Sequence, residues 1–457
     1  MPISQPAQDA LAALLGPRFS TAMAERDLHN NSETFHRSAP PDAVAWPETT
    51  EEVSAVLRIC NQHGVPVIAW GTGTSLEGHS LATQGGLTLD LSRMNRILHV
   101  GAEDMLAVVQ PGVTREALNV ELRATGLFFP VDPGANASIG GMASTRASGT
   151  TAVRYGTMRG NVLALEAVLA DGTVIRTGTR AAKSSNGYDL TALMVGSEGT
   201  LGVITELTVR LHGQPEDMAA AVCAFPTLHD AVACVATTMA AGVPMARIEF
   251  IDEKVVKVFN GESGTNWPEL PHLMLEFHGS PDSVKAAAEA FGAIAEDFGG
   301  AGFDWATSPE ARNRLWEMRH SSYWTVMKLR PGATGVVTDI CVPMSELADA
   351  VAAAAADLET VGLIGMIVGH VGDGNFHATM LVDPASPDEV KAAKRIARVM
   401  AERAIAVHGT ISGEHGIGIG KRDLMEEQHG PGAIGAMRAI KAALDPNGIL
   451  NPGKLLP

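Results

Sequence analysis

Apolar and polar residues alternate in two different patterns from Pro41 onwards, and together they predict strands and helices in turn. Thr50 to His63 has helical spacing with early acidic residues, and Gly64 ends it. Val65 to Trp70 is a short apolar run typical of a strand. The first forty residues are expected to form helix and loop. Further strands are expected at residues 87–91, 106–110, 162–169, 173–176 and 202–211, and a further helix at 114–125.

The pattern changes at Gly213, where we place a domain boundary. Three units of strand, helix and strand follow, and such units favour an open sheet with helices on one face. They cover residues 219–251, 273–305 and 336–370, and from residue 413 the chain is rich in glycine and then helical. The sequence therefore predicts an α+β protein. Its parts are residues 1–213 with a helical lead-in at 1–40, residues 214–412, and a C-terminal segment at 413–457.

Composition narrows the class of protein. The chain has 457 residues and a net charge of −17, which argues against nucleic acid as a partner because its binding needs clustered cations. We expect no secretory signal and no transmembrane segment, since no run approaches about 20 apolar residues. The cysteines form no CxxC pair, which argues against an iron–sulfur cluster and favours a cytoplasmic protein. They are Cys60, Cys223, Cys234 and Cys341.

Two histidines flank a glycine-rich turn in the segment HVGDGNFH, which begins at His370 and ends at His377. Gly372 to Asn375 consists of residue types that favour a turn. The apolar runs on either side therefore predict a hairpin in which His370 pairs with His377. Both imidazoles then project from one face, with Cβ atoms about 5 Å apart. Two imidazoles and one carboxylate make a divalent-metal site that suits zinc, manganese or iron. The alternative is an ordinary cross-strand pair.

Glu414 is the expected third ligand. It lies in a glycine-rich loop that is too polar for a core, and His415 follows it directly. One of the two side chains can bind metal while the other acts as a base, which gives their adjacency a chemical purpose. The alternative is a solvated turn.

A run of small residues, Val131 to Met142, would make a poor core but suits a backbone that lies along a phosphorylated ligand. Together with the loop that begins at Gly71, it is expected to cradle a pyrophosphate. A dinucleotide fingerprint of the GxGxxG type is absent from the N-terminal region, since the sixth position of that pattern is Leu76.

These segments resemble the FAD-dependent D-2-hydroxyacid dehydrogenases of the vanillyl-alcohol-oxidase (PCMH-type) fold, and most of all the cytochrome-type D-lactate dehydrogenases. Glycolate dehydrogenase flavin subunits and D-2-hydroxyglutarate dehydrogenases are cousins. The resemblance extends from about Pro41 to the C-terminus. The matching stretches are Gly71–Gly78, Phe129–Ala135, Ala152–Thr157, Gly196–Gly202, His370–His377, Gly413–Gly418 and Asn451–Lys454.

The resemblance implies a two-lobed FAD-binding domain at 1–213, a substrate or cap domain with an open antiparallel sheet at 214–412, and a C-terminal segment that returns to the FAD-binding domain. Thr74 occupies the position at which some relatives carry an FAD-linking histidine, so we expect non-covalent FAD, and His79 is expected to be a turn residue. The residues expected to hold FAD are Gly71, Thr72, Gly73, Thr74, Ser75, Gly78, Pro133, Gly134, Ile139, Gly140, Gly141, Ser148, Gly149, Arg154, Tyr155, Gly156, Glu198, Gly199, Val203, Ile204 and Asn451.

The implied reaction is oxidation of a small D-2-hydroxyacid, such as D-lactate, to the 2-oxoacid. A metal on His370, His377 and Glu414 would bind the hydroxyl and carboxylate oxygens, His415 would take the hydroxyl proton, and hydride would pass to flavin N5. Arg319 matches the family's arginine for the substrate carboxylate. Its alternative role is that of a helix-surface arginine.

One departure from the family bears on the substrate. Hydroxyglutarate-type relatives carry a lysine where this chain has Val337, so a dicarboxylate is disfavoured. Tyr323 and Trp324 are expected either to form an apolar wall for the substrate or to belong to the core.

Other functions stay open: a glycolate dehydrogenase flavin subunit, a D-2-hydroxyglutarate dehydrogenase, a non-redox relative such as the ether-lipid synthases, or a sensor without turnover. Electrons are expected to leave to an external acceptor, which is a cytochrome, a quinone or an electron-transfer flavoprotein. A peripheral association with the inner membrane and a homodimer are also left open.

Overall fold

The computed structural model describes residues 3–30, 34–37, 39–181, 183–306 and 308–457, and they form two compact units. Unit 1 contains the described residues up to Ser148 together with Gly156–Gln214 and Glu414–Pro457. Unit 2 contains Gly149–Tyr155 and Pro215–Gly413. Each unit has its own sheets and its own hydrophobic core.

The first sheet of unit 1 has four strands in the order β1-β2-β4-β3. Helix α3 packs over it and ends as the sequence predicts, because Gly64 takes the left-handed conformation with a φ of 62°. Residues of α1 and of α3 share one core with the strands. The elements are α1 (Gln5–Leu15), β1 (Phe19–Ser20), α2 (Met23–Leu28), β2 (Ala43–Ala45), α3 (Thr50–His63), β3 (Val67–Trp70) and β4 (Leu87–Asp90).

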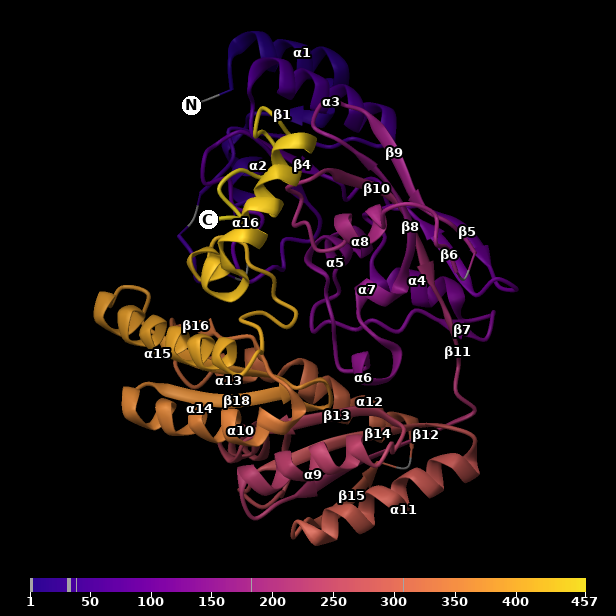
Figure 1. Ribbon diagram of the computed structural model, residues 1–457, viewed down its shortest axis with the longest axis vertical. Coiled ribbons are helices and arrows are strands. Elements are labelled where there is room, and N and C mark those ends of the chain that lie inside the picture. The colour runs from indigo at the N-terminus through magenta and orange to yellow at the C-terminus, as the bar shows by residue number, and fades with distance from the viewer. Residues whose placement is uncertain (1–2, 31–33, 38, 182, 307) are drawn as a thin grey trace. The chain divides into compact units, whose positions relative to one another are not determined.

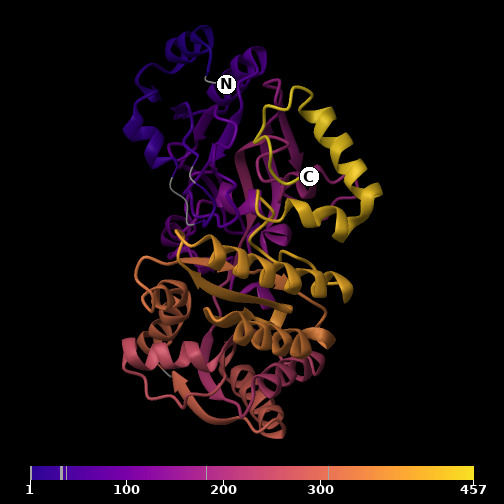
Figure 2. The ribbon, with the colours of Figure 1, turned by 90° about the vertical axis from the view of Figure 1, so that its left-hand side faces the viewer.

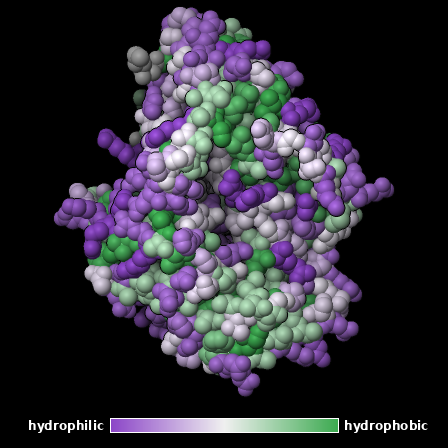
Figure 3. Space-filling view, in the orientation of Figure 1, coloured by the Kyte–Doolittle hydropathy of each residue, from purple (hydrophilic) through white to green (hydrophobic). Residues whose placement is uncertain are grey.

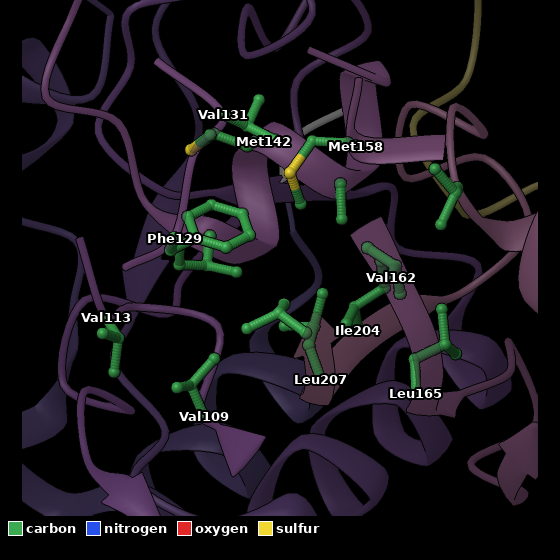
Figure 4. Packing of buried hydrophobic residues seen from close by; sticks show 14 of the residues in the cluster. Val109, Val113, Phe129, Val131, Met142, Met158, Val162, Leu165, Ile204 and Leu207 are labelled. Atoms are coloured by element: carbon green, nitrogen blue, oxygen red, sulfur yellow. The ribbon is translucent and has the colours of Figure 1, made fainter. Parts of the chain in front are cut away.

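The second sheet of unit 1 has five antiparallel strands in the order β5-β6-β10-β8-β9. Its core includes Phe129, which is 1% exposed, with Met142 and Met158 nearby (Figure 4). The elements are β5 (Ile97–Gly101), β6 (Leu106–Val109), α4 (Arg115–Leu122), β7 (Leu127–Phe128), α5 (Ile139–Thr145), α7 (Met158–Asn161), β8 (Val162–Val168), β9 (Val174–Gly178), α8 (Leu190–Met194), β10 (Val203–Arg210) and β11 (His212–Gly213).

The C-terminal part of unit 1 is helix α16 (Met425–Leu444), drawn in yellow in Figure 1. The helix is interrupted where Gly430, with a φ of 73°, precedes Pro431, since proline removes a helical hydrogen bond. The chain then returns to the first sheet, where Val67 donates to the Ile449 carbonyl and Asn451 donates to the Val67 carbonyl. The helical C-terminal tail expected from the sequence is present.

The main sheet of unit 2 has the strand order β15-β12-β14-β13-β18-β19-β16, and β17 pairs with β19. The pairings among its described residues are all antiparallel, as the family resemblance implied. The elements are α6 (Ala152–Tyr155), β12 (Asp217–Ala224), α9 (Leu228–Ala240), β13 (Met245–Ile251), α10 (Glu253–Ser263), β14 (His272–Gly279), α11 (Pro281–Asp297), β15 (Ala301–Ala306), α12 (Pro309–His320), α13 (Ser322–Met327), β16 (Thr334–Val337), β17 (Ile340–Cys341), α14 (Leu347–Val361), β18 (Ile364–His370), β19 (Asn375–Val382) and α15 (Pro387–Ala406).

Helices cover this sheet on both faces, which corrects the expectation of helices on one face only. The long helices α11, α9, α14 and α15 contact one another in that order, and Figure 2 shows α14 and α15 lying side by side in orange. Helices α10, α12 and α13 share a separate core with Val222, Met274 and Met366. The residues next to Val222, Met274 and Met366 along their strands point to the opposite face of the sheet, so both faces have apolar side chains to bury.

The short segment 149–155 belongs to unit 2, although the sequence analysis placed it in the FAD-binding domain. Arg154 donates to the Pro244 carbonyl at 3.3 Å, and the Tyr155 hydroxyl lies 2.8 Å from Nδ1 of His278. Val153 lies against Gly372, because a Cβ added at Gly372 would lie 2.8 Å from the Val153 side chain. These contacts join sequence-distant residues, which explains why the local pattern did not indicate them.

The face shown in Figure 3 is mixed, with hydrophilic residues in purple and several hydrophobic patches in green, one of them in the upper centre of the view. None of the helices in the described part of the chain is long and apolar enough to cross a bilayer.

Candidate active site

The two predicted metal-binding histidines lie on one face of the unit 2 sheet, at the hairpin of β18 and β19. His370 pairs with Asn375 and Val368 pairs with His377, so the expected pairing of His370 with His377 is wrong by two residues. The reason is that residues 371–373 form a short helical turn closed by Gly374. A shift of two keeps both imidazoles on the same face, and their ring centroids are 5.4 Å apart.

Gly374 is the residue that makes this turn possible. Its φ is 77°, and a Cβ at this position would lie 2.3 Å from the Val342 carbonyl oxygen. Any other residue would both strain the backbone and displace the neighbouring chain. The glycine-rich motif therefore fixes the turn between the two strands that carry His370 and His377.

Both imidazoles are buried, and each is held through Nδ1. Nδ1 of His370 lies 2.8 Å from Oε1 of Glu249, and Nδ1 of His377 lies 3.1 Å from the Thr338 carbonyl oxygen. A carbonyl and an ionised carboxylate only accept hydrogen bonds, so in the neutral imidazoles Nδ1 carries the proton. Nε2 of each ring then keeps its lone pair, which is the arrangement of a metal-ligating histidine.

Arg319 is buried beside the same face, and the alternative of a helix-surface arginine is wrong. It lies in the last turn of α12, whose start is fixed by Pro309 and by the cap that Ser308 provides. Leu315 and Trp316 are buried on the same side of the helix. Arg319 is 6% exposed, and its Nη2 lies 2.7 Å from Oε2 of Glu249.

Asp339 is a fully buried carboxylate next to His377, at 3.7 Å from its Nδ1. Its Oδ1 accepts a hydrogen bond from Asn375, and its Oδ2 accepts one of 2.7 Å from the Ser412 hydroxyl. Its backbone carbonyl accepts a bond from the N–H of Gly413, the last residue of unit 2. The end of the unit 2 chain is therefore tied to the strand region beside His377.

In unit 1 the loop after β3 fits the role expected for a pyrophosphate cradle. Within the described chain no partner is recorded for the backbone N–H groups of residues 72–75, which leaves them as donors for a ligand. Gly73 has a φ of 71°, and a Cβ there would lie 2.3 Å from the Trp70 ring. The loop also lies near Ser138, which caps the start of α5 by accepting from Gly141.

A cluster around Glu198 in unit 1 joins three of the stretches that carry the family resemblance, Gly196–Gly202, Gly413–Gly418 and Asn451–Lys454. The Asn451 side chain donates to the carbonyls of His79 and Glu198, at 3.2 Å and 2.7 Å. Burial opposes ionisation of Glu198, but His79 and the backbone N–H groups of Ile417 and Gly418 lower the pKa of its carboxyl. Nε2 of His79 lies 3.1 Å from Oε2 of Glu198, and His79 lies in a turn, as the sequence analysis expected, with its side chain buried.

Glu414 and His415 begin the C-terminal segment of unit 1, and neither forms a solvated turn. Their side chains are 14% and 12% exposed, and Nε2 of His415 lies 4.0 Å from Oε1 of Glu414. Lys421, further along the segment, pairs with the buried Glu77 at 3.0 Å. Burial opposes ionisation of Glu77, but Lys421, His36 and His415 lower its pKa to about 2.

The remaining predicted FAD-binding residues fall into three groups. Val203, Ile204 and Ile139 have buried side chains that belong to the cores of unit 1, so only their backbone is placed to meet a ligand. Gly149, Arg154 and Tyr155 lie in unit 2. The others lie in loops and helix starts of unit 1: Gly78, Pro133, Gly134, Gly140, Ser148, Gly156 and Gly199.

Replacing Gly73 with alanine should weaken FAD binding by roughly 10- to 100-fold, because the strain of a positive φ costs about 1–3 kcal/mol and the new Cβ displaces the Trp70 ring. Titration of FAD into the apoprotein measures the effect. Gly160→Ala is the matched control, since Gly160 lies exposed in α7 with nothing within 4 Å of its Cβ position. Equal affinity of the two variants for FAD would remove the loop from the cofactor site.

Comparison with known proteins identifies the family. Residues 214–455 match the family described as FAD linked oxidases, C-terminal domain, and residues 41–178 match the FAD binding domain family. The chain belongs to the FAD-linked oxidases. It is 49% identical over 440 residues to "Probable D-lactate dehydrogenase, mitochondrial" of Danio rerio, covering 96% of this chain and 88% of that protein.

A second relative of this FAD-linked oxidoreductase is "D-lactate dehydrogenase [cytochrome], mitochondrial" of Arabidopsis thaliana. The two are 43% identical over 449 residues, which is 98% of this chain and 79% of the relative. Among solved structures, p-cresol methylhydroxylase with substrate bound matches with a TM-score of 0.81 at 20% identity, over 99% of this chain and 98% of that one. That likeness shows the fold and confirms the PCMH-type expectation.

Sequence reasoning missed two residues of the site, Glu249 and Asp339. Glu249 lies in a strand where Arg247, Glu249 and Ile251 share one face and Ile248 points to the other. A charged residue at alternate positions of an otherwise apolar strand was the available signal. Asp339 had no comparable signal, because its partners follow it by 36 and 73 residues.

Proposed function

We propose that this FAD-linked oxidoreductase oxidises D-lactate, or a similar small D-2-hydroxy monocarboxylate, to the 2-oxoacid in a reaction that depends on a divalent metal. The observation that carries the substrate class is the identity of 49% and 43% with two proteins named as D-lactate dehydrogenases, over nearly the whole chain. The metal dependence draws its support from two buried histidines that share one face of the sheet, each held through Nδ1, with ring centroids 5.4 Å apart.

His370 and His377 are the first two proposed ligands, and Glu414 is the third. Ser412 and Gly413 are hydrogen-bonded to Asp339 beside His377, and Glu414 is the next residue. Consecutive Cα atoms are about 3.8 Å apart, so the backbone of Glu414 starts one residue beyond the point that is tied beside His377. Two imidazoles and a carboxylate suit zinc, manganese or iron, and an ion there would supply Lewis-acid chemistry to a substrate hydroxyl.

The chain's other residues supply binding and proton transfer. Arg319 holds the substrate carboxylate, which its planar fork of donors suits. His415 accepts the proton of the substrate hydroxyl. FAD, held by the loops of unit 1, supplies the hydride acceptor when bound. Electrons then leave to an external acceptor, for which a cytochrome, a quinone and an electron-transfer flavoprotein remain candidates. A cytoplasmic location also stays a prediction, since the names of both relatives place those proteins in mitochondria.

A panel of D- and L-2-hydroxyacids tests this proposal, with anaerobic loss of the yellow flavin absorbance as the readout. We expect D-lactate to bleach the flavin rapidly and L-lactate to leave it oxidised. D-2-Hydroxyglutarate should react poorly, because Val337 stands where hydroxyglutarate-type relatives have a lysine. A protein that no D-2-hydroxyacid reduces would contradict the proposed activity and favour a non-redox relative or a sensor.

Replacing Arg319 with alanine should raise the KM for D-lactate by roughly 10- to 100-fold, since hydrogen bonds to charged groups contribute about 1.5–3 kcal/mol. The effect on kcat should be smaller, because Arg319 contacts the carboxylate and not the reacting carbon. Steady-state kinetics with a dye acceptor separate the two constants. Arg314→Ala, an exposed arginine of the same helix, is the control, and an unchanged KM in the Arg319 variant would remove Arg319 from the site.

A further inference from the structure

Glu249 contacts both Arg319 and His370, two residues that the proposed function uses for different purposes. One carboxylate oxygen, Oε1, lies 2.8 Å from Nδ1 of His370. The other, Oε2, lies 2.7 Å from Nη2 of Arg319. The carboxylate of Glu249 is 1% exposed, and it comes from the middle of the sheet in β13. A single buried side chain therefore joins the proposed metal ligand to the proposed substrate-binding arginine.

The contact with His370 decides which ring nitrogen is available. An ionised carboxylate accepts only, so the proton of a neutral His370 stays on Nδ1 and Nε2 keeps its lone pair. A carboxylate that accepts from a metal-ligating imidazole also fixes the orientation of the ring and increases the basicity of the ligating nitrogen. Without Glu249, the ring of His370 could rotate or carry its proton on Nε2, and either change would remove a ligand.

The contact with Arg319 leaves donors unused. Oε2 of Glu249 lies close to Nη2, but the angle does not meet that of a hydrogen bond, and Nε and Nη2 are buried without a hydrogen-bond partner in the described chain. A buried guanidinium with unpaired N–H groups is costly unless a ligand supplies acceptors. The charge of Glu249 holds the guanidinium in place while its donors remain available to a substrate carboxylate.

We propose that Glu249 is a positioning residue that sets both the metal affinity and the substrate affinity of this site. The inference rests on the proposed function, because it assigns Glu249 a role toward the proposed ligand His370 and toward Arg319. Glu249 itself touches neither metal nor substrate. Its effect passes through the tautomer and orientation of His370 and through the position of the Arg319 guanidinium.

The same sheet face offers a matched control in Glu276. It is also buried, at 2% exposed, and it also binds a histidine, with Oε1 2.6 Å from Nε2 of His278. Its other oxygen accepts from the indole of Trp316. A variant at Glu276 therefore disturbs a comparable buried carboxylate without a contact to His370 or Arg319.

The test compares E249Q, E249A and E276Q in the full chain with FAD bound. Mn²⁺ titration of the metal-free protein gives the metal Kd, and kinetics with D-lactate at saturating Mn²⁺ give KM and kcat. For E249A we expect the metal Kd to rise by about 10- to 100-fold and the KM to rise by roughly tenfold or more. E249Q keeps an amide oxygen for His370 but loses the charge that holds Arg319. Its metal Kd should therefore stay within a few-fold of wild type while its KM rises.

Two outcomes overturn the inference. One is a set of Glu249 variants with wild-type Kd and KM, and the other is an E276Q protein that shows the same losses as E249Q. If E249A does not fold, E249Q still separates KM from metal Kd and carries the test. Failure of the proposed function looks different, because wild-type protein would then bind no Mn²⁺ or would not be reduced by D-lactate. A wild type that behaves as proposed, with Glu249 variants that match it, overturns this inference alone.

Discussion

Replacing His377 with alanine is expected to abolish D-lactate oxidation and to leave the yellow FAD bound. The imidazole is held at Nδ1 by the Thr338 carbonyl, so the substitution removes a proposed ligand together with its anchored geometry. A Lewis-acid ion contributes several kcal/mol to a reaction of this kind. A loss of about 4 kcal/mol corresponds to a fall in kcat/KM of about 1,000-fold.

The control for this variant is His272→Ala. His272 is also buried in unit 2, and its Nδ1 also binds a backbone carbonyl, that of Leu270. It lies at the start of β14, however, and stacks on Trp267. We expect its loss to lower stability but to change turnover by only a few-fold. The FAD content and Mn²⁺ affinity of both variants complete the comparison. A colourless His377 variant would mean that the cofactor and metal regions are wrongly assigned.

Replacing His415 with alanine should lower kcat by about 10²- to 10⁴-fold, the usual contribution of a positioned general base. The FAD and metal content should stay at wild-type levels, because His415 is proposed to hold neither. Pre-steady-state reduction of the flavin by D-lactate measures the chemical step without interference from the electron acceptor.

The pH–rate profile gives a second readout for His415. A base that must be unprotonated limits the rate at low pH, so the variant should lose the acid limb that wild type shows. Added imidazole should restore part of the activity, since it can enter the space that the side chain leaves. A variant with a kcat within tenfold of wild type and an unchanged profile would assign the proton transfer to another group.

The sequence was sufficient to predict the fold where its signals were local. The helix at Thr50–His63 has the predicted bounds, because Thr49, Glu52 and Gly64 supply a cap and a stop within the segment itself. The face shared by His370 and His377 was also predictable, since side chains alternate along a strand. The exact partner of His370 was not, because four residues of turn can close a hairpin in more than one register.

The parts of the site that depend on distant residues could not be predicted from the sequence. Glu249 and His370 are 121 residues apart, and no local pattern placed the helix of Arg319 beside them. The segment of Tyr155 shows the same limit, because its attachment to His278 spans 123 residues. Local patterns report which face a side chain occupies, whereas the neighbour across that face is set by the packing of the whole sheet.

The central claim is that a divalent metal takes part in the oxidation, and it can be tested on the unmodified protein. Metal-free enzyme prepared with a chelator, with its FAD retained, is mixed anaerobically with D-lactate, and bleaching of the flavin is followed before and after Mn²⁺ or Zn²⁺ is restored. The account predicts that bleaching slows by at least about 100-fold without metal and recovers on its return. Bleaching at the same rate in metal-free and metal-loaded enzyme would contradict it.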